Sequence, residues 1–215
     1  MEALPGSGSI SSICVPLSAP SAPGVPDLDA SSDTGTSNTD NITSDNTPTL
    51  SATGGANGDT ITLSATNGTD TVSCSYVVGS ATNCTLPTLS DGTWTISSTV
   101  TDPAGNSSTS ASTLSVSIDT DAVGGRIPDL NAASDTGVSS TDDITSDTTP
   151  TFSLTGQVVG DVVVITASRA GATDVTCTYT VGVASSCTLG ALTDGEWSVV
   201  ATITDLSGNT GSTTA

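Results

Sequence analysis

Short runs in which hydrophobic and polar residues alternate recur along this chain. Trp94 and Ile96 show the pattern, as do Leu114, Val116 and Ile118. A period of two places alternate side chains on the buried and the exposed face of a β-strand. Gly-containing turns separate the runs. In the first half of the chain, the pattern predicts strands over 47–53, 60–65, 71–78, 83–86, 93–101 and 113–118.

The sequence contains an internal repeat at an offset of 102–103 residues. Pro26-Asp27-Leu28 recurs as Pro128-Asp129-Leu130, and Trp94 recurs as Trp197. Six or seven strands in about 100 residues match the size of an immunoglobulin-type sandwich. We therefore predict an all-β protein of tandem immunoglobulin-like β-sandwiches, with a leader over 1–23 and domains over 24–121 and 122–215.

The second copy is expected to lack its own final strand, because Ala215 corresponds to Ser112, just before the strand at 113–118. The leader contains Ile13-Cys14-Val15-Pro16-Leu17, which alternates like that strand. Strand donation from one subunit to the next would give a head-to-tail filament. The alternative is that this sequence was cut at arbitrary points from a longer array of such repeats. The predicted subunit contacts are Ile13, Cys14, Val15 and Leu17.

Four of the five cysteines form two equivalent pairs, Cys74 with Cys84 and Cys177 with Cys187. Counting outward from a hairpin centred on Gly79 places Cys74 opposite Cys84, within disulfide range. Zinc is disfavoured because the chain has no His and each copy has only one cysteine pair. Two disulfides indicate an oxidising, extracellular compartment. Cys14 is left as a free thiol or a link to another subunit.

The charge is strongly negative, with 22 acidic residues, two arginines and no histidine. A chain without a basic patch cannot neutralise phosphates, so nucleic acid is excluded as a partner. No run of about 18 apolar residues is present, so membrane insertion is not expected. A hydrolytic triad needs a base, and neither His nor Lys is available, so we do not expect an enzyme.

The stretch from Pro128-Asp129-Leu130 through Ser134-Asp135-Thr136-Gly137 to Thr148-Thr149-Pro150-Thr151, followed by Asp194-Gly195 and Thr204-Asp205, resembles bacterial Ig-like repeats of large surface adhesins of the biofilm and RTX type. The resemblance covers roughly residues 24–215. It implies a bacterial cell-surface location and a rigid extender rod, typically bound to calcium. The cysteine pairs depart from the usual cysteine-free pattern of such repeats.

Aspartate accounts for almost all of the acidic residues, and it suits both turns and hard-cation sites. We expect late loops and incoming linkers to meet at one end of a sandwich, which would let carboxylates converge. Capping of turns and solubility are the alternative roles. The candidate calcium ligands are Asp27, Asp29, Asp33, Asp40, Asp102, Asp119, Asp121, Asp129, Asp135, Asp142 and Asp205.

These observations, together with the resemblance to surface-adhesin repeats, predict a non-enzymatic structural or adhesive module of a bacterial extracellular fibre, rigidified by calcium. Its partners would be copies of itself, as adjacent repeats or filament neighbours, and host or surface ligands. The alternative is a subunit that polymerises through residues 13–17. A glycan-binding module is a weaker alternative.

Overall fold

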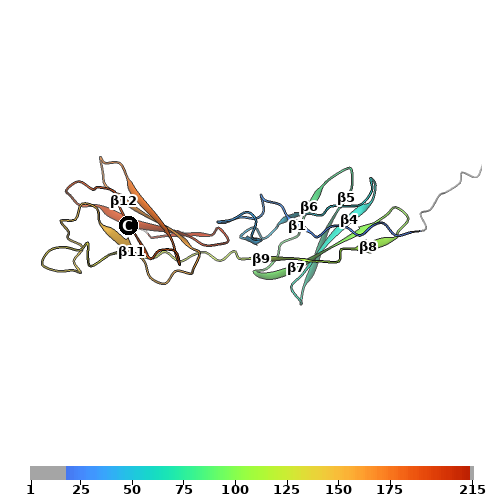
Figure 1. Cartoon of the computed structure of the whole chain (residues 1–215), viewed down its shortest axis with the longest axis horizontal. Helices are drawn as coiled ribbons and strands as arrows, with labels where there is room; N and C mark the ends of the chain where they lie inside the picture. Colours follow the sequence, from blue (N-terminus) through green and yellow to red (C-terminus); the bar gives the residue numbers. More distant parts are fainter. Residues whose placement is uncertain (1–17, 214–215) are drawn as a thin grey trace, which may run out of the picture.

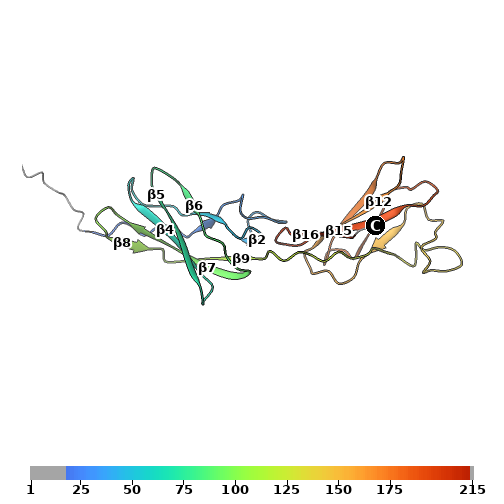
Figure 2. The same cartoon turned by 180° about the vertical axis from the view of Figure 1, so that it is seen from behind.

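The computed structural model describes residues 18–213 and consists of two β-sandwich domains that lie end to end (Figures 1 and 2). The predicted subunit contacts Ile13, Cys14, Val15 and Leu17 lie outside the described residues. No helix within 18–213 is long and apolar enough to cross a membrane.

Domain 1 contains β1 (Asp27–Leu28), β2 (Ile42–Thr43), β3 (Thr49–Ser51), β4 (Thr60–Thr66), β5 (Thr71–Val77), β6 (Asn83–Thr85), β7 (Gly92–Thr101), β8 (Ser107–Thr109) and β9 (Leu114–Ile118).

Domain 2 repeats this arrangement with fewer strands. One sheet of domain 1 has the order β2-β9-β7-β4-β5, with β8 also paired to β7, and the other has the order β1-β3-β6. The sheets of domain 2 have the orders β13-β12-β15-β16 and β10-β11-β14. Its strands are β10 (Asp129–Leu130), β11 (Thr151–Ser153), β12 (Val162–Ser168), β13 (Val175–Thr180), β14 (Ser186–Thr188), β15 (Ser198–Thr204) and β16 (Thr210–Ser212).

Alternation within the central strands builds each core. In β4 the side chains of Ile61, Leu63 and Ala65 are buried, while the threonines and serine between them are partly exposed. Trp94 completes the core of domain 1, and its indole Nε1 donates a hydrogen bond to the carbonyl oxygen of Ser90 at 2.9 Å. Burying each such aliphatic side chain contributes about 1.5–3 kcal/mol. Aliphatic side chains from the alternating strands, joined by a few aromatic ones, thus build the two cores.

The disulfides predicted from the cysteine spacing join Cys74 to Cys84 and Cys177 to Cys187. The hairpin used to predict them is wrong. Cys74 lies on β5, which pairs with β4, whereas Cys84 lies on β6, which pairs with β3 in the other sheet. The chain crosses between sheets around Gly79, with a single bridge between Val78 and Ala81. Each disulfide therefore links the two sheets of its sandwich at their edges.

The two domains differ at one edge. In domain 1, β9 pairs with both β7 and β2. In the described residues of domain 2, no strand occupies the equivalent position, and Ile144-Thr145, the counterpart of β2, is not a strand. The side chain of Trp94 is 2% exposed, whereas Trp197 is only partly buried. A final strand supplied to domain 2 stays a prediction.

Candidate functional site

A short loop of domain 2, Asp205–Asn209, lies at the junction with domain 1. It connects β15 to β16, and the carboxylate of Asp205 holds its shape. Asp205 Oδ1 accepts hydrogen bonds from the backbone N–H groups of Gly208 at 2.8 Å and Asn209 at 2.9 Å. Asp205 Oδ2 accepts a third from Asn209 Nδ2 at 3.0 Å. A short aspartate side chain is suited to this local capping.

The capped loop docks on two turns of domain 1. Thr34 Oγ1 and the backbone N–H of Ser44 both donate hydrogen bonds to the carbonyl oxygen of Ser207, at 2.8 and 3.0 Å. Gly35, which follows Thr34, lies very close to the loop of domain 2. A Cβ added to Gly35 would lie 2.1 Å from the carbonyl oxygen of Leu206. Only glycine permits this approach, and its φ of 108° also disfavours other residues.

The same loop is tied to the linker between the domains. Asn209 Nδ2 donates a hydrogen bond to the carbonyl oxygen of Asp119 at 2.9 Å, and Ser207 Oγ donates one to Asp119 Oδ2 at 3.1 Å. As expected from the sandwich geometry, a late loop and a linker therefore meet. Contacts to two turns and the linker restrict bending at this junction more than a single linker would.

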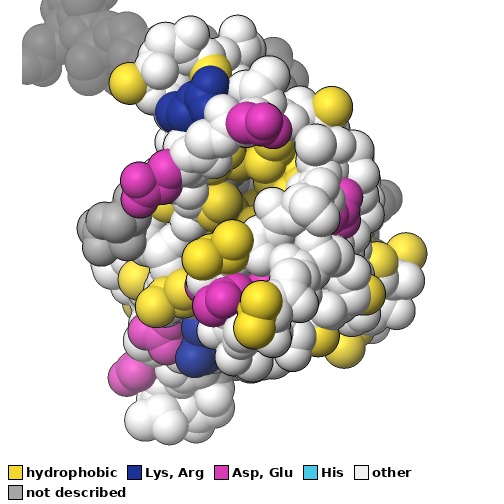
Figure 3. Space-filling view, turned by 90° about the vertical axis from the view of Figure 1, so that its left-hand side faces the viewer, with side chains coloured by type: hydrophobic (Ala, Val, Ile, Leu, Met, Phe, Trp, Pro, Cys, Tyr) yellow, Lys and Arg dark blue, Asp and Glu magenta, His cyan; other side chains and the backbone are white. Residues whose placement is uncertain are grey.

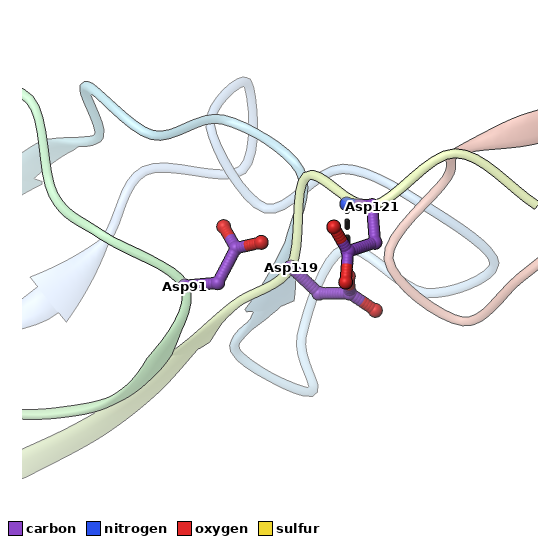
Figure 4. A group of neighbouring side chains, drawn as sticks. All are labelled: Asp91, Asp119 and Asp121. Atoms are coloured by element: carbon purple, nitrogen blue, oxygen red, sulfur yellow. Dashed lines mark hydrogen bonds between the residues drawn. The ribbon is translucent and has the colours of Figure 1, made fainter.

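Three carboxylates gather where the linker leaves domain 1. Ligand atoms of Asp91, Asp119 and Asp121 lie within 4.8 Å of one another (Figure 4). Asp91 precedes β7 and Asp119 follows β9, and the pairing of Gly92 with Ile118 brings them together. Within residues 18–213, no other group of three or more His, Cys, Asp or Glu side chains meets this criterion.

Local hydrogen bonds orient these carboxylates without neutralising them. Asp91 Oδ1 accepts from the N–H and the hydroxyl of Thr120 at 3.1 and 2.9 Å, and Asp119 Oδ1 accepts from the N–H of Asp121 at 3.1 Å. Three negative charges at such separations repel one another. A divalent cation with oxygen preference would relieve this repulsion, since calcium accepts carboxylates in flexible geometry. Sequence reasoning missed Asp91, although strand pairing at the Asp91-Gly92 turn could have placed it.

A second feature is a buried aspartate at the same place in each domain. Asp33 and Asp135 are each 4% exposed. Asp33 Oδ1 and both carboxylate oxygens of Asp135 have no hydrogen-bond partner among the described residues. Burial raises the pKa of Asp33, and the neighbouring charge of Asp40 raises it further. A buried polar atom without a partner is costly, so these loops are the second place where a cation would fit.

The other candidate ligands are dispersed. Asp102 caps its own loop, and the hydrogen bond from Asn106 is the main reason that its pKa lies below the usual value. Asp29 accepts a hydrogen bond from Asn83 Nδ2 at 2.8 Å. The remaining members are exposed and lie outside the three-carboxylate group: Asp27, Asp40, Asp129 and Asp142.

A family model described as "Bacterial Ig-like domain" matches residues 19–120 and 124–215. The chain belongs to this family. No curated protein matches the sequence. Membership in the family accounts for the two sandwiches and for the repeat, and it agrees with the resemblance found in the sequence. As a pair of bacterial Ig-like domains with disulfides, the chain has the character of an extracellular or surface protein.

The chain is similar to several solved structures. A tetra-tandem repeat in the extending region of a large adhesion protein is 23% identical, with a TM-score of 0.33, and the match covers 78% of this chain and 44% of that one. The FN1-FN3 domains of chicken CNTN1 are 10% identical, with a TM-score of 0.52, covering 90% and 61%.

A calcium-stabilised adhesin with which an Antarctic bacterium binds ice is 22% identical, with a TM-score of 0.40, covering 91% of this chain and 49% of that one. The chain thus spans 44–61% of the length of these three structures.

Proposed function

We propose that this chain is a non-enzymatic spacer segment of a bacterial surface adhesin, and that calcium stiffens its module junction. The observation that carries the proposal is the docked loop Asp205–Asn209, whose hydrogen bonds reach two turns of domain 1 and the linker. A spacer holds a binding element away from the cell, so it must resist bending. A junction with directional contacts on several sides serves that purpose better than a free linker.

Calcium is the ion that the donor set favours. Asp91, Asp119 and Asp121 offer hard carboxylate oxygens at the surface, and extracellular modules bind calcium at about 10⁻⁴–10⁻³ M. Asp119 also accepts the hydrogen bond of Ser207 from domain 2. An ion held by Asp119 and Asp121 would therefore fix the linker residue on which the second domain docks. Asp33 and Asp135 would hold further ions inside the loops of each domain.

Calcium titration of the 215-residue chain tests this function. Isothermal titration calorimetry should show binding in the range of 10⁻⁴–10⁻³ M, and the double substitution D119N/D121N should remove the junction site. A double variant of exposed turn residues, D70N/D174N, changes the net charge equally and serves as the control. Equal binding by the two double variants would contradict a site at the junction.

A second candidate is a subunit of a head-to-tail filament. The strand pairs that β9 makes with β7 have no counterpart in the described part of domain 2. Residues 13–17 of a neighbouring subunit would supply the partner. Electron microscopy of the full chain and of a chain without residues 1–17 tests this candidate. Polymers that persist after the deletion would exclude it.

A further inference from the structure

Domain 1 contains two Asn-Gly pairs, Asn57-Gly58 and Asn67-Gly68, and both lie at exposed turns. Asn57-Gly58 precedes β4, and Asn67-Gly68 lies in the turn that connects β4 to β5. In such a pair the backbone nitrogen of the glycine can attack the side-chain carbonyl carbon of the asparagine, because glycine has no Cβ to hinder the approach. The two pairs can therefore be compared as sites of the same reaction.

Steric access to the two pairs is the same. Gly58 and Gly68 have similar backbone conformations, with φ of 97° and 91°. A Cβ added to either glycine would meet no atom within 4 Å. The side chains of Asn57 and Asn67 are both exposed. The feature that distinguishes the two pairs is their hydrogen bonding.

The side chain of Asn67 is held by two backbone donors. Its Oδ1 accepts hydrogen bonds from the N–H groups of Thr69 at 3.0 Å and Asp70 at 2.7 Å. Two N–H groups that donate to one carbonyl oxygen stabilise the negative charge that develops on it when a nucleophile adds to the carbon, as in an oxyanion hole. The side-chain carbonyl carbon Cγ of Asn67 is therefore activated toward attack.

The attacking nitrogen at this pair lies outside the hydrogen-bond ladder of the sheet. The N–H of Gly68 donates to Oγ1 of Thr66 at 3.2 Å. Thr66 Oγ1 in turn donates to the carbonyl oxygen of Asp70 at 2.9 Å, which fixes the hydroxyl beside the nitrogen. Attack by the nitrogen of Gly68 on Asn67 therefore breaks no backbone hydrogen bond.

Asn57-Gly58 lacks both of these features. The N–H of Gly58 donates to the carbonyl oxygen of Val78 at 3.0 Å, so attack by its nitrogen would break a backbone hydrogen bond. Among residues 18–213, no N–H or O–H group donates to Oδ1 of Asn57. The carbonyl carbon of Asn57 is therefore not activated, and the neighbouring nitrogen is held by the fold.

We propose that Asn67 is a site of spontaneous deamidation, which the turn between β4 and β5 assists with its own groups. The nitrogen of Gly68 forms a bond to Cγ of Asn67 and gives up its proton to solvent, and the side-chain nitrogen takes up a proton and leaves as ammonia. Water then opens the resulting succinimide at either carbonyl group, which gives aspartate or isoaspartate at position 67. The reaction requires no oxidant, reductant or second protein.

The product changes the turn in two ways. An aspartate at position 67 places a new negative charge beside Asp70, in a chain whose net charge is already −20. An isoaspartate adds one methylene group to the backbone of the turn, where the N–H of Asn67 donates to the carbonyl oxygen of Asp70 at 3.3 Å. Domain 2, whose end away from domain 1 faces the viewer in Figure 3, has no Asn-Gly pair. The modification therefore accumulates with the age of the chain in domain 1 alone.

Peptide mass spectrometry of the full 215-residue chain during incubation in a mildly alkaline buffer tests this site. In the folded chain, conversion of Asn67 should be at least about tenfold faster than that of Asn57, because only Asn57 must break a backbone hydrogen bond and lacks donors to Oδ1. In urea the two pairs should react at similar rates. Similar rates in the folded chain would overturn the assignment, as would slower conversion of Asn67 in the folded chain than in urea.

The substitution T66V tests the part played by the hydroxyl. Valine retains the branched shape and the strand preference of threonine but accepts no hydrogen bond from Gly68. T66V should slow the conversion of Asn67 by about threefold to tenfold, the rate equivalent of one hydrogen bond. T62V, at another partly exposed threonine of β4, is the control and should leave the rate unchanged. Conversion that is equally fast or faster in T66V than in T62V would reject Thr66 as part of the site.

Discussion

Asn209 of domain 2 donates a hydrogen bond from Nδ2 to the carbonyl oxygen of Asp119 in the linker, at 2.9 Å. The same amide also binds Asp205 within its own loop. We predict that N209A lowers the stability of domain 2 by about 1 kcal/mol, the net worth of a hydrogen bond. It should also widen the distribution of angles between the domains, as measured by residual dipolar couplings.

The matched control for this prediction is N106A. Asn106 binds Asp102 through Nδ2 at 2.9 Å, in the equivalent loop of domain 1. That loop precedes β8, at the end of domain 1 away from domain 2 (Figure 1). N106A should lower the stability of domain 1 and leave the orientation of the domains unchanged. A wider angular distribution in N106A than in N209A would contradict the role assigned to Asn209.

Gly35 and Gly137 form a second matched pair. Both have positive φ, of 108° and 138°, so replacing either with alanine should cost of order 1–3 kcal/mol in backbone strain. Only at Gly35 would the new Cβ meet the other domain, at 2.1 Å from Leu206 O, whereas the nearest atom to a Cβ at Gly137 is 3.6 Å away. G35A should therefore separate the domains in small-angle scattering, and G137A should not. Identical scattering curves would show that the contact at Gly35 does not set the junction.

The pH dependence of stability should carry a contribution from Asp33. Burial raises the pKa of Asp33 above the ordinary value of an aspartate, so the folded protein holds this proton more tightly than the unfolded chain. The contribution of Asp33 to the free energy of unfolding is therefore fully present at a pH below the pKa that Asp33 has in the unfolded chain. It is lost as the pH rises through the pKa that Asp33 has in the folded protein. Asp102 acts in the opposite direction, because its lowered pKa gives stability that is lost on acidification.

The variant D33N isolates this contribution. At neutral pH in a chelator it should stabilise domain 1 by about 1–3 kcal/mol, because it removes a buried charge without a full set of partners. In calcium the gain should shrink or reverse, since the variant would lose a ligand. Urea denaturation from pH 3 to 8 with and without calcium measures both effects. A destabilised D33N in the chelator would contradict this explanation.

The disulfides should contribute to stability in both domains. Each closes a loop with a sequence separation of 10 residues. Closing about ten residues reduces the entropy of the unfolded chain by an amount worth about 2.7 kcal/mol. The double substitutions C74S/C84S and C177S/C187S should each lower the free energy of unfolding of their own domain by that amount in chemical denaturation. An unchanged midpoint in either variant would show that sheet packing alone holds that edge.

Much of the fold was predictable from the sequence. The alternation of buried and exposed side chains within a strand depends on neighbouring residues, and the internal repeat shows the same pattern in both domains. The expected strand at 60–65 is observed as Thr60–Thr66, and that at 113–118 as Leu114–Ile118. The prediction of a hairpin at Gly79 was wrong. Whether the chain pairs with the preceding strand or crosses to the other sheet depends on packing at the edges of the two sheets, which the residues next to Gly79 do not determine. The contact of Thr34 with Ser207 joins residues 173 apart in the sequence, through common polar groups with no distinctive pattern.

The central claim is that calcium holds the two domains as one stiff rod. Small-angle scattering of the 215-residue chain in calcium and in a chelator tests it most directly, with D119N/D121N alongside. We predict a narrow, extended distribution of interatomic distances in calcium, a broader one in the chelator, and the broader one under both conditions for the double variant. A native chain whose distribution is identical in calcium and in the chelator would contradict the claim.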